Sequence, residues 1–477
     1  MSQTPITLRA FNKSSSVKDK QDSSIPIFRG DLEQLNRTKL KAAPEVTSED
    51  APMVLRSLGS FEEFFWLIDQ NRPIHFALAA QIQGPTTVLG WRDALDLVQR
   101  RHPLLSVCIK MGENSRPCFR REIAAPIPLR VLQGNNAAQR WALEMELELS
   151  IPFDAAQAPL MRAVLLHEAN QAVIILVAHH SIADGRSIVF LVRDVLEALS
   201  GNVLDSLPLL ASHEELLGLN GSVAALPAGP KKEESSPVTL STRPASYVKK
   251  ESLRPHIKGL RLAPALTSKL RNRARQERTT VHGALSAAMA LAAWENYPEF
   301  RDAPIRICSP IDTRKLLGLG EDCAVLIDAG VVTLESQMPS DFWDIARESI
   351  ANLAGAQTME GVIASRTFLY QAIKSDIDVL KAAAICAQGF AHEMMLTNLG
   401  QLPYGTEFGQ LRLEAVWGPA VSARFAGAPT IGVATTNGAL CLLETHFSEP
   451  GSLLETAEQI LMSACAVHSP SQLVNSI

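Results

Sequence analysis

Residues 179–185 read His-His-Ser-Ile-Ala-Asp-Gly, and this stretch decides how the rest of the chain is interpreted. It follows Ala172–Ala178, an unbroken apolar run, Ala-Val-Ile-Ile-Leu-Val-Ala, which predicts a central strand buried on both faces. It precedes a segment from about Ser187 whose apolar residues recur at helical spacing. A loop between such a strand and such a helix presents its side chains to the crevice beyond the sheet, where ligands commonly bind.

The residues of this loop are suited to acid–base chemistry. A histidine such as His180 can remove a proton at neutral pH, because its unperturbed pKa is about 6.5. Gly185 permits a close approach of the backbone to a ligand, or a turn that other residues resist. Asp184 stands just before the predicted helix and also fits an N-cap. No third or fourth ligand follows at metal-binding spacing, so the stretch predicts no metal site.

Apolar patterns before and after this stretch predict a mixture of strands and helices. The pair Asn437–Gly438 between two apolar runs is the strongest short signal for a hairpin. The predicted elements are a helix over 61–68 capped by Ser60, strands over 75–82, 160–166, 172–178 and 304–310 and near 257, helices over 89–101 and 340–354 and from about 452, and hairpin strands over 430–436 and 439–446.

The length and composition of the chain predict its domain organisation. With 477 residues, 46% of them hydrophobic and 20% charged, the chain can build two domains with large cores. Residues 1–50 are polar and predict a largely disordered leader. Residues 218–250 are rich in Gly, Pro, Ser and Lys, as in a linker or a crossover loop. Residues 51–217 are therefore expected to form an N-terminal lobe, and residues 251–477 a C-terminal lobe.

Charge and motif content exclude several classes of protein. With a net charge of -5, the chain lacks the positive electrostatic field that is typical of nucleic-acid-binding proteins. The seven cysteines are scattered, odd in number and without a Cys-x-x-Cys pair, which favours buried thiols in a reducing compartment over disulfides or zinc. Because the chain shows neither a signal peptide nor an apolar stretch of ~20 residues, we expect a cytoplasmic protein without a membrane span. P-loop, dinucleotide-binding, zinc-protease and Gly-x-Ser-x-Gly patterns do not occur in the sequence.

The pattern His-His-x-x-x-Asp-Gly resembles the signature of an acyltransferase superfamily. This superfamily includes chloramphenicol acetyltransferase, peptide-synthetase condensation domains and the polyketide-associated acyltransferases, and the segment Glu449-Pro-Gly451 looks most like the last of these. The resemblance covers roughly residues 55–470. The further segments that look similar are Leu58–Glu63, Arg101–Leu105, Pro152–Asp154, Ser309–Arg314 and Thr397–Gly400.

The resemblance implies a fold and a catalytic apparatus. The expected fold is α/β, with two chloramphenicol-acetyltransferase-like lobes, each a mixed sheet flanked by helices, and an active-site channel between them. His180 would be the general base, with His179 beside it at the substrate. The Gly185 N–H and the Thr397 hydroxyl, next to Asn398, would stabilise the oxyanion.

The resemblance also implies a pairing across the lobes. Asp184 would point away from the substrate and pair with Arg314, which fixes the loop; the alternative for Arg314 is a solvated surface cation. One basic helix face has two interpretations as well. It binds the phosphates of coenzyme A or of a phosphopantetheinyl carrier protein, or it is a solvated face without a ligand. Its members are Arg271, Arg275 and Arg278, with Arg273 beside them.

The implied activity is acyl transfer from a thioester donor to a small-molecule alcohol, which forms an ester. The donor would be an acyl-CoA or a phosphopantetheinyl carrier protein, and no cofactor would be bound permanently. We expect a free-standing, monomeric enzyme. Two alternatives stay open: a condensation-type amide synthase, and a catalytically idle relative that only binds a carrier protein. The intact pair of His180 and Asp184 argues against the idle relative.

Overall fold

The apolar run before the His-His motif forms β7 (Gln171–His179), an inner strand of a six-stranded sheet. β2 (His75–Gln83) and β6 (Met161–His167) pair with it on its two sides, both antiparallel. Every residue of β7 after Gln171 is buried, because side chains from helices cover both faces of this sheet. The predicted strand buried on both faces is therefore confirmed.

The structure is a computed structural model that describes residues 53–122, 125–134, 136–219, 254–300, 303–336, 341–389, 391–422, 429–447 and 451–466. These residues belong to one compact unit, Asp50–Ile477. The predicted leader 1–50 lies outside the described residues. So does the predicted linker 218–250, except for Gly218 and Leu219.

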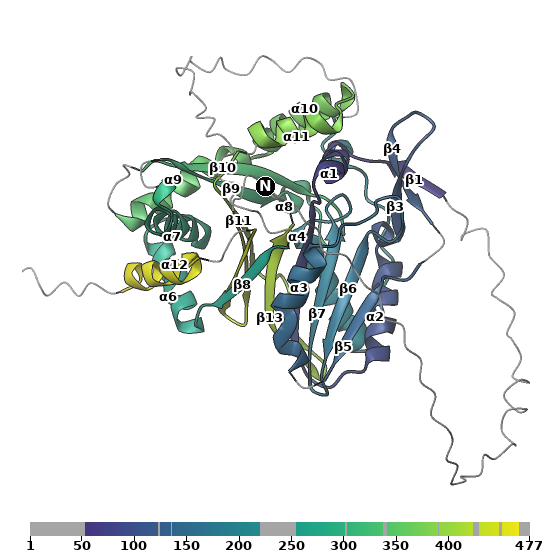
Figure 1. The fold of residues 1–477 in the computed structure, drawn as a ribbon, viewed down its shortest axis with the longest axis horizontal. Helices are drawn as coiled ribbons and strands as arrows, with labels where there is room; N and C mark the ends of the chain where they lie inside the picture. Colours follow the sequence, from purple (N-terminus) through teal and green to yellow (C-terminus); the bar gives the residue numbers. More distant parts are fainter. Residues whose placement is uncertain are drawn as a thin grey trace, which may run out of the picture. The chain divides into compact units, whose positions relative to one another are not determined.

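A strand from the C-terminal half of the sequence takes part in the first sheet. β13 (Leu411–Val421) pairs antiparallel with β2, and the strand order is β12-β13-β2-β7-β6-β5. β12 (Glu407–Phe408) and β5 (Leu129–Gln133) are the edges, and β5 runs parallel to β6. The two halves of the sequence therefore share one sheet (Figure 1).

The second six-stranded sheet draws its strands from the C-terminal half, in the order β10-β9-β11-β14-β15-β8. β11 runs parallel to both of its neighbours and the other pairs are antiparallel, so this sheet is mixed, as predicted. The predicted hairpin is present, and both turn residues, Asn437 and Gly438, have positive φ. The strands are β8 (His256–Arg261), β9 (Ile305–Asp312), β10 (Ile327–Leu334), β11 (Met394–Gln401), β14 (Thr430–Thr436) and β15 (Ala439–His446).

A small antiparallel sheet of three strands was not expected from the sequence. It consists of β1 (Met53–Ser57), β4 (Pro117–Arg121) and β3 (Val107–Met111), in that order. Each strand has only five residues. Strands this short carry too few alternating positions for hydrophobic periodicity to distinguish them from a loop.

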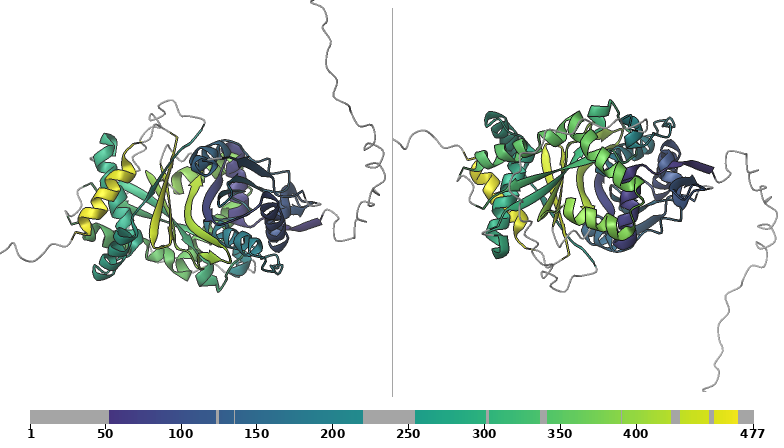
Figure 2. Two further views of the ribbon diagram at one scale, coloured as in Figure 1. Left: turned by 90° about the horizontal axis from the view of Figure 1, so that it is seen from below. Right: turned by 90° about the horizontal axis from the view of Figure 1, so that it is seen from above.

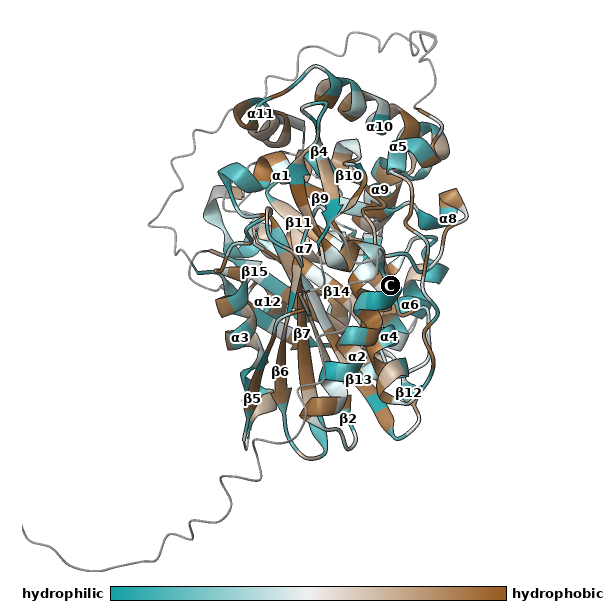
Figure 3. Ribbon diagram, turned by 90° about the vertical axis from the view of Figure 1, so that its right-hand side faces the viewer, coloured by the Kyte–Doolittle hydropathy of each residue, from teal (hydrophilic) through white to brown (hydrophobic). Residues whose placement is uncertain are grey.

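Helices flank both large sheets, as predicted. α2 and α4 pack together on one face of the first sheet, and α3 packs on the other. α9 and α12 each pack on α7 beside the second sheet (Figures 1 and 2), and Figure 3 shows β6 and β7 as mostly hydrophobic. The helices are α1 (Ser60–Asn71), α2 (Val88–Arg101), α3 (Trp141–Leu149), α4 (Gly185–Leu199), α5 (His213–Leu216), α6 (Pro264–Gln276), α7 (Val281–Asn296), α8 (Arg314–Leu317), α9 (Phe342–Leu353), α10 (Met359–Lys374), α11 (Val379–Gly389) and α12 (Leu453–Ala464).

The start of α1 differs from the prediction, which made Ser60 the N-cap. Gly59 occupies the N-cap position instead. Its N–H donates to the Glu62 carboxylate at 2.6 Å, and the N–H of Ser60 donates to Glu214 at 2.7 Å. Two buried carboxylates thus satisfy the free amides at this helix start, so no serine hydroxyl is needed there.

Three further expectations from the sequence concern the cysteines, a membrane-spanning helix and a metal site. All seven cysteines are free and buried, which confirms their interpretation as small core residues. Of the described helices, none is long and apolar enough to cross a membrane. Within the same described ranges, no group of three or more His, Cys, Asp or Glu side chains is placed to hold a metal ion.

One acidic side chain of the second sheet is buried without a hydrogen-bond partner among the described residues. Glu444 of β15 is fully buried, and neither of its carboxylate oxygens has a hydrogen-bond partner within the described residues. Lys258 stands opposite it on β8, but the Lys258 ammonium donates to Glu455 and to the carbonyl of Gly451. Burial raises the pKa of Glu444 to about 7, and the charge of Lys258 offsets this only in part.

Glu444→Gln is expected to stabilise the protein at pH 8 and to change little at pH 4.5. The folded carboxyl keeps its proton up to about pH 7, whereas the unfolded one loses it near its ordinary pKa of 4.5. The stability that the protonated group contributes is therefore fully present below pH 4.5 and is lost as the pH rises to 7. The difference corresponds to about 3 kcal/mol at most. Urea unfolding at the two pH values measures it, and an equal effect at both would contradict the assignment.

Candidate active site

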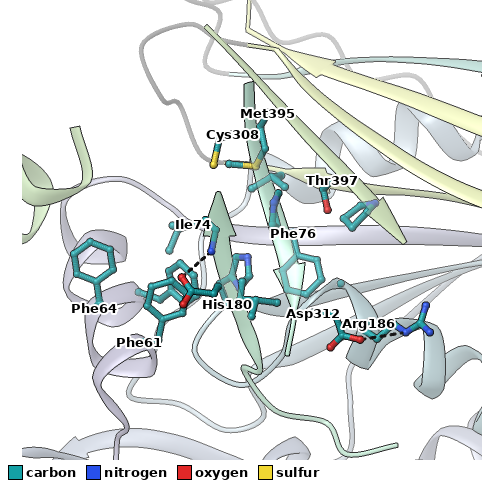
Figure 4. A pocket seen from close by; sticks show the side chains of 18 of the residues that line it. Phe61, Phe64, Ile74, Phe76, His180, Arg186, Cys308, Asp312, Met395 and Thr397 are labelled. Atoms are coloured by element: carbon teal, nitrogen blue, oxygen red, sulfur yellow. Dashed lines mark hydrogen bonds and ion pairs between the residues drawn. The ribbon is translucent and has the colours of Figure 1, made fainter. Parts of the chain in front are cut away.

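The loop after β7 faces a cavity whose walls come from both halves of the sequence. One wall consists of side chains of α1 and β2, and the other of β9, β10 and β11, with two residues of β13 between them. Figure 4 shows the His180 ring between the phenylalanines of α1 and the side chains of Asp312 and Arg186. The lining is mostly apolar and includes Phe61, Phe64, Phe65, Ile68, Phe76 and Met395.

His180 is held in one orientation and one tautomer. Its Nδ1 lies 3.1 Å from the carbonyl oxygen of Ala183, and since a carbonyl only accepts, Nδ1 carries the proton. The ring stacks on Phe65 at a centroid distance of 4.2 Å and contacts Phe76 at 4.7 Å. Nε2 has no hydrogen-bond partner in the described part of the chain, so its lone pair is available to a ligand.

The surroundings of His180 keep its ring uncharged. Burial lowers the pKa of His180 to about 4, and the nearby Asp184 carboxylate raises it only in part. At neutral pH the ring is therefore in the form that accepts a proton.

His179 does not line the cavity, which corrects the prediction that it lies at the substrate. Its ring is fully buried; Nδ1 accepts from the N–H of Ser181 at 3.1 Å, and Nε2 lies 3.4 Å from Asp69. Burial alone would raise the pKa of Asp69, but the nearby His179 ring and the N–H of Ile74, which donates to Asp69 at 2.9 Å, hold it below its usual value. Neighbouring residues at the end of a strand point in opposite directions, so the two histidines cannot both face the cavity.

Asp184 serves both of the roles that the sequence left open for it. Its Oδ1 caps α4 by accepting from the N–H of Ser187 at 2.8 Å, and its Oδ2 is 2.9 Å from Nη1 of Arg314. Both side chains of this ion pair are buried, so the predicted pair is present and Arg314 is not a solvated cation. Burial opposes ionisation, but Arg314 and the N–H groups of Leu326 and Ser187 together hold the pKa of Asp184 below its usual range. Asp184 does not line the cavity, and its part in the site is to position the loop.

Gly185 is required by a close contact rather than by a turn. It is the first residue of α4, its φ is not positive, and it lines the cavity. A Cβ at this position would lie 2.8 Å from Cγ of Pro419 and 3.1 Å from a methyl group of Leu399. A larger side chain would therefore push α4 away from the C-terminal half. As the first residue of a helix, Gly185 has an N–H without an intrahelical acceptor.

The two predicted residues of β11 also reach the cavity. Thr397 and Asn398 both line it, and the Thr397 hydroxyl forms no hydrogen bond with any described residue. The Asn398 Oδ1 accepts from the N–H of Gly400 at 2.8 Å, so it supports the end of the strand. Of the predicted site residues, the structure thus brings His180, Gly185, Thr397 and Asn398 together around one cavity.

Two known families match this chain, one in each half of the sequence. Residues 72–211 match the Condensation domain family, and residues 251–423 match the family described as the C-terminus of phthiocerol/phthiodiolone dimycocerosyl transferase. The fold is that of the chloramphenicol acetyltransferase-like proteins. A segment of 168 residues, 33% of the chain, is 30% identical to phosphinothricin tripeptide synthetase PhsC of Streptomyces viridochromogenes and spans 15% of that protein.

Solved structures of the superfamily share the fold over most of the chain. Polyketide synthase associated protein 5 from Mycobacterium tuberculosis is 19% identical, with a TM-score of 0.62 over 87% of this chain and 99% of that one. The first condensation domain of the CDA synthetase is 14% identical, with a TM-score of 0.62 over 86% and 96%. The trichothecene 15-O-acetyltransferase of Fusarium sporotrichioides is 11% identical, with a TM-score of 0.61 over 88% and 97%.

Sequence reasoning missed several residues that line the cavity. The phenylalanines of α1 were predicted only as part of a helix, and neither Arg186 nor Asp312 was singled out. Signals for the two charged residues were present, because Arg186 directly follows the His-His motif and Asp312 lies two residues before Arg314. For the phenylalanines there was none, since an apolar stripe on a helix has the same pattern whether it meets a core or a cavity.

The predicted basic helix face is only partly formed. α6 ends at Gln276, so Arg278 lies beyond it, with a φ of 55. Arg271 and Arg275 are exposed on α6, and Arg273 pairs with Glu277. These arginines do not line the cavity, and their binding of donor phosphates stays a prediction.

Proposed function

We propose that the protein is an acyltransferase that moves an acyl group from a thioester donor to a small-molecule alcohol and forms an ester. The donor is an acyl-CoA or an acyl carrier protein, and the reaction needs no bound cofactor. The observation that carries the proposal is the uncharged His180 ring, which donates from Nδ1 to Ala183 and offers a free Nε2 to an apolar cavity.

The reaction begins with a proton transfer to His180. Its Nε2 takes the proton of the acceptor hydroxyl as that oxygen attacks the thioester carbonyl and the C–O bond forms. The negative charge of Asp184, which raises the pKa of His180, stabilises the imidazolium. The Gly185 N–H and the Thr397 hydroxyl are the donors for the tetrahedral oxyanion, a contribution of about 3 kcal/mol to the barrier. The C–S bond then breaks, and the leaving thiolate takes the proton back from His180.

The apolar walls of the cavity support transfer over hydrolysis. Phe61 and Phe64 of α1 line the side of the cavity next to His180 (Figure 4), and the ring of Phe65, which also lines the cavity, stacks on His180. Water competes poorly for apolar surface of this kind, so an acyl chain excludes it from the thioester carbonyl.

The pH profile of kcat/KM is expected to hold its plateau well below pH 6.5. Because burial lowers the pKa of His180 to about 4, the free enzyme keeps an unprotonated base until the pH falls to that value. We expect the acid limb of the profile near pH 4. The measurement is acyl transfer from an acyl-CoA from about pH 3 to about pH 8, with circular dichroism at each pH as the control for folding. A half-loss near pH 6.5 with the fold intact would show that the base is solvated.

A second candidate function is amide synthesis by the same site. The match of residues 72–211 to the Condensation domain family and the similarity to a tripeptide synthetase favour it. Against it, an alcohol must lose its proton as it attacks, which suits a histidine base, whereas a neutral amine is already nucleophilic.

Matched acceptors distinguish the two functions. Two compounds that differ only in –OH and –NH₂ are incubated with the protein and a panel of acyl-CoA thioesters, and the products are measured by mass spectrometry. The ester-forming proposal expects the higher kcat/KM for the alcohol after correction for the neutral fraction of the amine. A higher value for the amine supports the amide synthase. Binding of acyl carrier protein without turnover of any thioester supports an idle relative.

A further inference from the structure

A charged side chain lines the cavity on the side of His180 opposite the phenylalanines. Arg186 is the second residue of α4 and lines the cavity, with 22% of its side chain exposed (Figure 4). Its Nη1 donates to the carbonyl of Leu399 at 2.8 Å. No described residue accepts a hydrogen bond from its Nη2. The guanidinium is thus fixed at one end and has donors left for a ligand.

The nearest carboxylate does not satisfy this arginine. Asp312 Oδ1 accepts from the backbone N–H of Arg314 at 3.2 Å and from its Nη1 at 3.0 Å. The other oxygen, Oδ2, lies 3.8 Å from Nε of Arg186, which is too long for a hydrogen bond. Because Asp312 is committed to Arg314, the contact with Arg186 is a loose ion pair between partly exposed groups.

The cavity therefore offers different chemistry on the two sides of the base. One side presents the phenylalanines of α1, which suit an apolar acyl chain. The other presents a guanidinium with free donors. Arginine binds carboxylates through two parallel charge-assisted hydrogen bonds, and these are stronger than a separated ion pair.

We propose that Arg186 binds a carboxylate on the acceptor, so that the substrates of this site are hydroxy acids. This rests on the proposed acyl transfer. A carboxylate bound at Arg186 replaces the loose contact with Asp312 by direct hydrogen bonds and leaves the hydroxyl of the same molecule to His180. Arg186 is then a specificity-determining residue that selects acids over their esters.

The experiment compares hydroxy acids with their methyl esters. The probes are lactate, 3-hydroxybutyrate and 6-hydroxyhexanoate, each with its methyl ester, at a fixed acyl-CoA. The variants are Arg186→Met, which keeps the length of the side chain without its charge, Arg186→Lys, and the control Arg100→Met, an exposed arginine of α2 outside the cavity. Calorimetric titration with the same probes measures binding without turnover.

The expected result is a preference for an acid over its ester that depends on Arg186. Arg186→Met should lower the acid-to-ester ratio of kcat/KM by about 10-fold to 100-fold, the effect of a charged hydrogen-bonded pair. Arg186→Lys should recover part of it, and Arg100→Met should not alter it. An unaltered ratio in Arg186→Met, or no preference of the wild-type protein for any acid, would overturn the proposal.

A second comparison separates the acceptor carboxylate from the phosphates of the donor. An acyl-CoA is compared with the same acyl group on N-acetylcysteamine, which carries no phosphate, with a neutral alcohol as acceptor. If Arg186→Met weakens only the use of the acyl-CoA, Arg186 binds the donor and the proposal is wrong. If wild-type protein turns over no thioester, the proposed function fails, and the titration alone then decides whether Arg186 selects an acid over its ester.

Discussion

His180→Ala is expected to lower kcat/KM for acyl transfer by about 10²–10⁴-fold, the usual contribution of a general base. The ring is the only titratable group among the predicted site residues that the structure brings to the cavity, and burial keeps it in the base form. Its side chain faces a cavity, so its removal enlarges an existing space rather than opening the core. We therefore expect the free energy of unfolding to change by less than about 1 kcal/mol.

The matched control for this prediction is the neighbouring histidine. His179→Ala leaves the His180 ring in place but removes the partner of the partly buried Asp69 carboxylate. We expect it to lower the free energy of unfolding by about 1–3 kcal/mol, with the smaller effect on kcat/KM. Urea unfolding and steady-state kinetics on both variants measure the contrast. Near-wild-type turnover in His180→Ala would rule out its role as the base.

Asp184→Asn is expected to lower the free energy of unfolding by about 3–5 kcal/mol, because it removes the fully buried carboxylate that pairs with the buried charge of Arg314 and leaves only the partly exposed Asp312 beside it. The two residues stand 130 positions apart and join α4 of the N-terminal half to the segment after β9. Oδ2 of Asp184 also accepts from the N–H of Leu326 at 2.9 Å, so the carboxylate binds two separate segments of the C-terminal half. Activity should fall as well, since the loop that carries His180 loses its anchor.

A double-mutant cycle separates the pair from its surroundings. Urea unfolding is measured for Asp184→Asn, Arg314→Gln and the double variant. The two single variants each lose free energy of unfolding, and the sum of these losses should exceed the loss of the double variant by at least about 1 kcal/mol. The matched control is the cycle of Lys258→Gln and Glu455→Gln, a contact of 2.7 Å between partly exposed side chains, which should give about 0–1 kcal/mol. Strict additivity at Asp184 and Arg314 would show that the pair does not hold the halves together.

Local patterns predicted the elements that are built from local information. β7 was recognisable from seven apolar residues in a row, α4 from its helical spacing, and the hairpin of β14 and β15 from Asn437 and Gly438. Each of these patterns lies within about 20 residues, so one stretch of sequence contains all of it.

Long-range arrangements were not predictable in this way. Nothing in the residues of β13 indicates that it pairs with β2, more than 300 positions earlier, rather than with the sheet of its own half. The pair of Asp184 and Arg314 came from the family resemblance, not from spacing. The error at His179 has a local cause: two adjacent histidines look equivalent in a sequence, but only one of them faces the cavity.

The pairing of β13 with β2 has a mechanical consequence for substrate exchange. The ladder runs from Arg412 opposite Gln83 to Val421 opposite Phe76, and Phe76 and Val421 both line the cavity. A hinge motion that parted the two halves would have to break these backbone hydrogen bonds at the cavity wall itself. We therefore expect reactants and products to exchange through rotations of the side chains that line the cavity, and not through a swing of one half against the other.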